Sequence, residues 1–93
     1  MSDLETFISK EISLLIPSFE NIDFRAQIGD SSYSVEFFVT INGKKMQCYD
    51  MVDKGLIKES KLDSVSENIA KFIRRMPSYK KGTINKIKLT ISK

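Results

Sequence analysis

Few side chains in this sequence have the types and spacing that enzymatic chemistry requires. There is no histidine, so neither a serine–histidine nor a cysteine–histidine pair can form. The single cysteine, Cys48, cannot make a zinc site alone, and the four glycines are scattered instead of forming a phosphate-binding loop. Asp50 and Asp53 exemplify carboxylates that could serve acid–base chemistry, but capping of a loop or helix is the favoured role. We therefore expect no catalytic residue, cofactor or metal, and a protein that acts by binding a macromolecule.

A basic cluster near the C-terminal end is the first candidate binding site. It contains Tyr79 and these cations: Arg74, Arg75, Lys80, Lys81, Lys86 and Lys88. The cations could neutralise phosphates while Tyr79 stacks on a base, as in a small basic nucleic-acid-binding module. No recognised RNA-binding signature accompanies the cluster. The alternative, which we rank first, is a solvated helix end followed by lysines that protect an edge strand.

Hydrophobic periodicity predicts the elements that must carry these residues. Apolar side chains recur at three- and four-residue steps in 4–15 and 62–76, the pattern of amphipathic helices, and Pro17 and Pro77 end the two stretches. They alternate with polar side chains in 22–28, 33–41 and 87–91, the pattern of half-buried strands. Residues 50–59 are interpreted as a loop with room for a short helical turn.

Asn42-Gly43 predicts a two-residue hairpin, because both residues tolerate the positive φ of a type I′ turn. The turn fixes these pairings across the hairpin: Ile41 with Lys44, Val39 with Met46, Phe37 with Cys48, and Glu36 with Tyr49. In this register Cys48 joins the apolar side chains of the inner face. We therefore interpret it as a buried, unreactive thiol.

The predicted fold is α+β, a single domain over residues 1–93 with the element order α-β-β-β-α-β. Its four-stranded, mainly antiparallel sheet begins as a meander of three strands, and the fourth strand joins after the second helix. Two amphipathic helices then cover one face of the sheet and leave the other partly open.

The outward side of the predicted hairpin is the second candidate site. It presents the aromatic side chains of Phe38 and Tyr49 with acids around them, among which Glu36, Asp50 and Asp53 are the nearest in sequence. An aromatic surface rimmed by acids suits a basic protein partner, such as a nuclease whose active site attracts RNA. Cross-strand packing that merely stabilises the sheet explains the same residues equally well.

Charge is divided unevenly along the chain. The net charge is +3, but residues 1–53 carry −5 and residues 54–93 carry +8. The N-terminus has acids where a secretion signal needs bases and an apolar stretch. The longest apolar run is three residues, so no membrane span is expected. A single cysteine cannot form an internal disulfide, and we expect a cytoplasmic protein.

Several stretches together resemble small bacterial immunity proteins, and in particular the CdiI-type immunity component of contact-dependent growth inhibition. The resemblance rests on 16–24, Tyr33–Phe38, Asn42-Gly43 and Gln47–Gly55, and it extends over most of the chain in length and element order. It implies a cytosolic protein that binds the C-terminal domain of one cognate toxin, often a tRNase or other nuclease, and blocks its active site. Such proteins are commonly acidic whereas this chain is basic, so either its acidic half makes the contact or the toxin is not a basic nuclease.

The leading hypothesis is therefore a toxin-neutralising immunity protein that works by occlusion. Carboxylates of Glu36, Asp50 and Asp53 would meet cations in the cleft of the toxin, and Phe38 and Tyr49 would be desolvated anchors. The alternative from a different class is nucleic-acid binding through Arg74, Arg75, Tyr79, Lys80 and Lys81.

Overall fold

The computed structural model describes residues 3–92 of the chain. Its elements follow the predicted order, with one short additional helix before the second long one. They are α1 (Asp3–Ser13), β1 (Asn21–Ile28), β2 (Tyr33–Ile41), β3 (Lys44–Gln47), α2 (Cys48–Asp53), α3 (Glu59–Arg74) and β4 (Asn85–Ser92).

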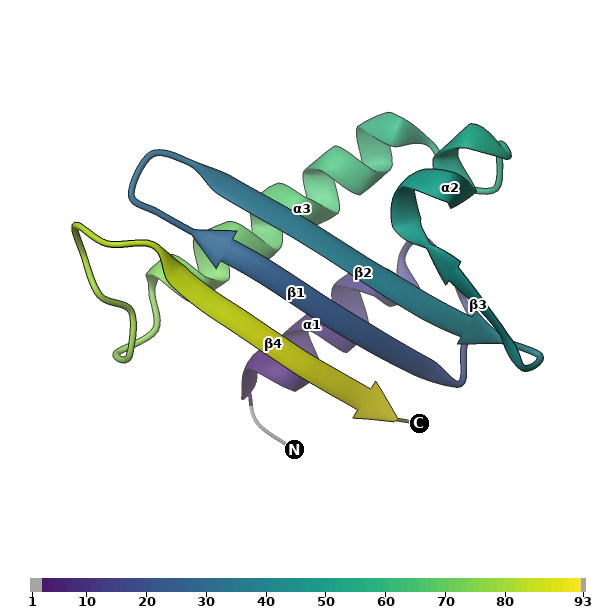
Figure 1. Ribbon diagram of the computed structural model, residues 1–93, viewed down its shortest axis with the longest axis horizontal. Helices are drawn as coiled ribbons and strands as arrows, with labels where there is room; N and C mark the ends of the chain where they lie inside the picture. Colours follow the sequence, from purple (N-terminus) through teal and green to yellow (C-terminus); the bar gives the residue numbers. More distant parts are fainter. Residues whose placement is uncertain (1–2, 93) are drawn as a thin grey trace.

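The strands form one four-stranded antiparallel sheet in the order β3-β2-β1-β4. The first three strands form the predicted meander, and β4 returns after α3 to pair with β1 along its whole length. Helices α1 and α3 pack against each other behind the sheet, while the face toward the viewer in Figure 1 carries no helix. The predicted α+β fold, with helices on one face and the other open, is confirmed.

The hairpin at Asn42-Gly43 fixes how β3 meets β2. Both residues have positive φ, 51° at Asn42 and 76° at Gly43, as a type I′ turn requires. The pairing starts with Ile41 opposite Lys44 and keeps the predicted register through β3. The Gly43 N–H also donates a hydrogen bond of 3.0 Å to the Glu20 carboxylate, which ties the turn to the start of β1.

The core lies between the inner face of the sheet and the two long helices. Phe24 and Phe37 face each other across β1 and β2, and both are fully buried. Phe7 of α1 stacks on Phe72 of α3 with ring centroids 4.3 Å apart, so the two helices are joined by an aromatic contact. Each large apolar side chain buried in this way contributes about 1.5–3 kcal/mol. Apolar and polar side chains alternate along β1 and β2, so the apolar face is covered by the helices and the polar face stays open.

The strand after the hairpin ends earlier than predicted. β3 stops at Gln47, and the chain continues as helix α2. The predicted pairings of Phe37 with Cys48 and of Glu36 with Tyr49 are therefore wrong.

The spacing of buried residues explains why α2 is a helix. Cys48 and Met51 are both buried, and residues three apart share one face of a helix, whereas in a strand they would point to opposite faces. Cys48 is inside the core as predicted, although it reaches it from a helix. Burial raises the pKa of its thiol above the ordinary value of 9.0.

Candidate interaction surfaces

Tyr49 is the centre of a surface where α2, β2 and the beginning of α3 meet. Its side chain is 49% exposed, and its hydroxyl donates a hydrogen bond of 3.2 Å to the carbonyl of Val35. Partial burial raises the pKa of Tyr49 above its ordinary value of 10.0, and the charges of Asp63 and Glu36 raise it further. A carboxylate from α3 and another from β2 therefore lie within electrostatic range of this phenol. We define the acidic–aromatic surface as Tyr49, Glu36, Asp63, Asp50 and Asp53.

The short β3 is what positions Tyr49. It pairs only with the last residues of β2, from Phe38 onward, so the first half of β2 has no strand on that side. Helix α2 occupies the vacant edge instead. The Tyr49 hydroxyl donates a hydrogen bond to the carbonyl of Val35, and Cys48 of the same helix is fully buried against the core. The hydrogen bond satisfies a carbonyl that an open strand edge would leave to solvent or to another chain.

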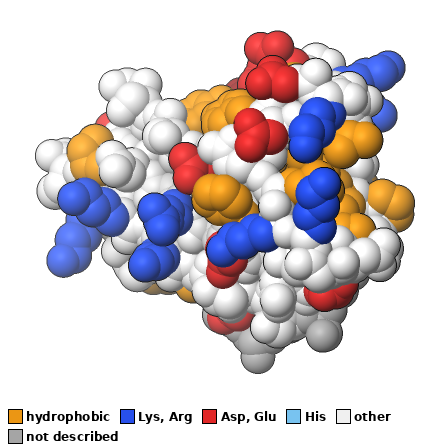
Figure 2. Space-filling view, turned by 45° about the vertical axis from the view of Figure 1, so that its right-hand side comes forward, with side chains coloured by type: hydrophobic (Ala, Val, Ile, Leu, Met, Phe, Trp, Pro, Cys, Tyr) orange, Lys and Arg blue, Asp and Glu red, His pale blue; other side chains and the backbone are white. Residues whose placement is uncertain are grey.

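Asp50 and Asp53 lie beside Tyr49 on α2, and both are exposed. Figure 2, which brings this end of the molecule forward, shows Asp and Glu side chains at the top and in the centre of the view, with Lys and Arg side chains among them. The acids of α2 therefore extend the acidic–aromatic surface from Tyr49 along the same helix.

Phe38 lies on the open face of the sheet, half-buried and two residues along β2 from Glu36. The Lys45 ammonium lies 5.2 Å from the centroid of its ring and forms an ion pair of 2.8 Å with Asp23. Hydrogen bonds from Lys45 and Thr90 lower the pKa of Asp23 below its ordinary value of 3.8. Part of the Phe38 ring is thus already engaged by a cation of this chain.

Glu36 lies within electrostatic range of Tyr49, although Tyr49 reaches this position from a helix and not through the predicted cross-strand pairing. Asp63 is a member of the surface that the sequence does not reveal. It is exposed on α3, and nothing in the spacing of that helix relates it to Tyr49, because the two come within electrostatic range only after the sheet and helices pack.

The basic cluster of the C-terminal region is partly used to hold the fold together. Arg74 donates from Nε to the carbonyl of Gly29 at 2.9 Å and from Nη2 to the carbonyl of Ser32 at 3.1 Å. Its guanidinium also lies 6.0 Å from the centroid of the Tyr33 ring. Arg74 therefore fastens the end of α3 to the turn between β1 and β2.

Tyr79 contacts the same turn through a carboxylate. Its hydroxyl donates to Asp30 Oδ1 at 2.6 Å, and the Gly82 N–H donates to Asp30 Oδ2 at 2.9 Å. These two hydrogen bonds lower the pKa of Asp30, and the contact with Asp30 raises the pKa of Tyr79.

The other three cations of the alternative nucleic-acid site remain accessible. Arg75, Lys80 and Lys81 are exposed, whereas Arg74 and Tyr79 are engaged with the turn between β1 and β2. The sequence places all five close together without showing this difference in their contacts.

No protein-family model matches the chain, and no curated protein or solved structure is significantly similar to it. Within residues 3–92, no three side chains among Cys, Asp and Glu are grouped so that they could hold a metal ion. None of the helices in that range is both long enough and apolar enough to cross a membrane.

Proposed function

We propose that this protein is an immunity protein that neutralises a cognate toxin by binding its C-terminal domain and covering the active site. The observation that carries the proposal is the convergence of Tyr49, Glu36 and Asp63 from three different elements. A surface of this kind complements a cleft that is basic because it binds RNA, so a nuclease such as a tRNase is the proposed target. On this proposal the protein acts in the cytosol, by occlusion and not by catalysis.

The anchor of the proposed interface is Tyr49. Tyrosine is among the residues that most often dominate binding energy at protein interfaces. The hydrogen bond from its hydroxyl to Val35 holds the side chain in place before any partner arrives. A fixed side chain loses less conformational entropy on binding than a free one, so Tyr49 is prepared to contribute its exposed half to an interface.

The carboxylates have a different role from the anchor. Asp50 and Asp53 are exposed, so their attraction to a basic toxin acts mainly on the rate of association and is screened by salt. Asp63 and Glu36 lie close enough to Tyr49 to affect its ionisation. In a complex they would be at the edge of the desolvated centre, where a cation of the toxin gains most from pairing.

Co-expression with the C-terminal domain of the protein encoded by the neighbouring upstream gene tests the proposal. The protein should restore growth and co-purify with that domain in equal amounts. Tyr49→Ala should weaken the complex by about 30-fold or more. Tyr49→Phe keeps the ring but loses the hydrogen bond to Val35, so its affinity should lie between those of the wild type and Tyr49→Ala. Asp3→Asn, at the start of α1, is the matched control for the charge variants Asp63→Asn and Glu36→Gln.

Absence of growth rescue together with absence of binding would refute the toxin proposal. Full binding by Tyr49→Ala, with binding lost in Asp3→Asn, would instead place the interface at the beginning of α1. Thermal unfolding of each variant, compared before the binding assays, separates loss of contact from loss of fold.

A further inference from the structure

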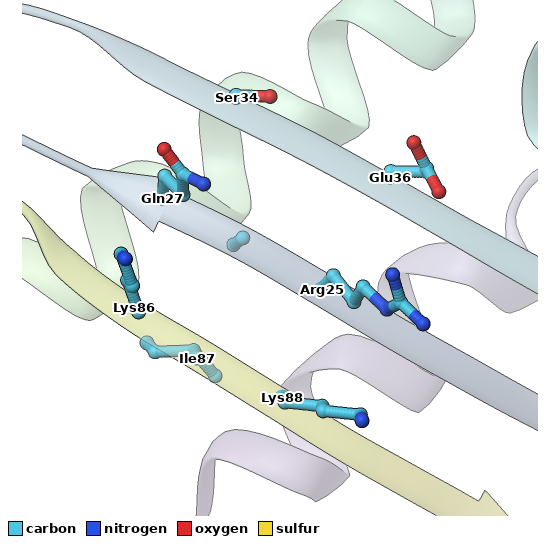
Figure 3. A pocket seen from close by; sticks show the side chains of 8 residues that line it. Arg25, Gln27, Ser34, Glu36, Lys86, Ile87 and Lys88 are labelled. Carbon is cyan, nitrogen blue, oxygen red and sulfur yellow. The ribbon is translucent and has the colours of Figure 1, made fainter.

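The open face of the sheet carries three cations that lie side by side on its last two strands. Arg25 of β1 is directly opposite Lys88 of β4, and Lys86 lies two residues further along β4. Figure 3 views this face and shows the three side chains around a shallow depression, together with Gln27 and Ser34. Across the sheet from Lys86, Gln27 and Ser34 add a polar row to the depression.

Among residues 3–92, no ion pair joins any of these three cations to a carboxylate, although the charge of Arg25 acts on Asp23, two residues earlier on β1. The ion pairs of that range join Lys45 to Asp23 and Lys71 to Glu67. Glu36 is opposite Arg25 on the other side of β1, yet no ion pair joins the two. Side chains directly opposite each other in a sheet have Cβ atoms about 5 Å apart, and like charges in such pairs are destabilising. The Arg25–Lys88 pair is therefore repulsive, and an external anion between the two side chains would relieve that repulsion.

The depression continues toward an aromatic side chain. It is about 400 Å³ in volume and is lined by the three cations, by Gln27 and Ser34, and by Glu36 at its rim. A second depression on the same face shares Arg25 and Lys88 with it and extends to Phe38, past the ion pair of Asp23 with Lys45. Cationic groups and an exposed part of an aromatic ring thus lie along one continuous open surface.

We propose that the open face of the sheet binds single-stranded nucleic acid, a second activity distinct from toxin neutralisation. Arg25, Lys86 and Lys88 would contact phosphates, and Phe38 would stack on a base. Proteins that bind single-stranded nucleic acid combine a cationic track with an aromatic side chain on which bases stack. An acidic peptide would use the cations but would gain nothing from the ring. The site is separate from Arg74 and Tyr79, which are engaged within the fold.

Fluorescence anisotropy with a labelled twelve-nucleotide oligouridine tests the inference on the full-length protein. Three phosphate contacts predict a slope of about −2 in log affinity against log salt, so affinity should fall about 20-fold between 50 and 200 mM salt. The triple variant R25Q/K86Q/K88Q should bind at least tenfold more weakly. The control K54Q/K58Q/K61Q removes the same charge at the end of α2 and the beginning of α3 and should stay within threefold of wild type.

Three results would overturn the inference. The first is an equal loss of binding in both triple variants, which would mean that net charge alone attracts the oligonucleotide. The second is equal affinity for a duplex of the same length, and the third is equal displacement by a polyaspartate peptide. Phe38→Leu should weaken binding at least threefold, and unchanged binding would remove the stacking role. Because all substituted cations are exposed, far-ultraviolet circular dichroism should report an unchanged fold.

Discussion

Replacing Arg74 tests whether this cation holds the fold or serves a ligand. Its guanidinium makes two hydrogen bonds, to Gly29 and Ser32, which fasten α3 to the turn between β1 and β2. Hydrogen bonds that involve a charged group contribute about 1.5–3 kcal/mol each when buried. Arg74 is only half-buried, so Arg74→Gln should lower the free energy of unfolding by about 2 kcal/mol in total.

Urea denaturation followed by circular dichroism measures this change. For a domain of this size the slope of stability against urea is about 1 kcal/mol per molar, so the midpoint should fall by about 2 M. Arg74→Lys keeps the charge but loses the planar fork, and it should recover less than half of the difference. Arg75→Gln is the matched control, because Arg75 is the adjacent exposed residue, and its effect should be within about 0.5 kcal/mol.

The structural role assigned to Arg74 would be refuted by equal midpoints for Arg74→Gln and Arg75→Gln. If Arg74→Gln were stable but had lost oligonucleotide binding, Arg74 would instead be a residue that contacts nucleic acid. Binding measured at low salt on the same preparations separates the two outcomes.

Four further predictions concern individual side chains. Hydrogen bonds lower the pKa of folded Asp30, so its contribution to stability is present at neutral pH and is lost as the pH falls below about 4. In Asp30→Asn, the urea midpoint should therefore fall less steeply between neutral and acid pH than it does in the wild type. The buried Cys48 thiol, whose pKa is raised, should resist an aromatic disulfide reagent until urea unfolds the chain. Lys88→Gln removes the repulsion with Arg25, so it should raise the free energy of unfolding by about 0.5 kcal/mol in 20 mM salt and change it little in 0.5 M salt. An equal gain at both salt concentrations would argue against this repulsion. Glu36→Gln should weaken toxin binding in pull-down titrations yet strengthen oligonucleotide binding in anisotropy; changes of equal sign would contradict the separate surfaces.

The part of the fold that the sequence predicts is the part governed by local rules. The positive φ values of Asn42 and Gly43 need only those two residues, and they set the register of β3. The alternation of β2 places Phe37 inside and Phe38 outside in the same way. Strand periodicity and turn chemistry act over a few residues, so they can be recognised without knowledge of the tertiary structure.

The interaction surfaces depend on contacts that local rules cannot supply. Tyr49 continues the alternation of the preceding strand, but the burial of both Cys48 and Met51 favours a helix there. The partner groups of Arg74 and Tyr79 are more than forty residues away in the sequence. A basic cluster was therefore visible in the sequence, while the division of its members between structural contacts and exposed positions was not.

The uneven charge along the sequence does not become two separate poles in space. β4 comes from the basic part of the chain but pairs with β1 from the acidic part, which places Lys88 beside Arg25. Asp63, from the basic part, lies within electrostatic range of Tyr49. Each surface is thus assembled from both parts of the chain, and the net charge of neither part predicts its partner. Glu36 lies where the surfaces meet, opposite Arg25 on one side and near Tyr49 on the other. The negative charge of Glu36 would therefore weaken the binding of a polyanion to the open face and strengthen the binding of a basic protein at α2.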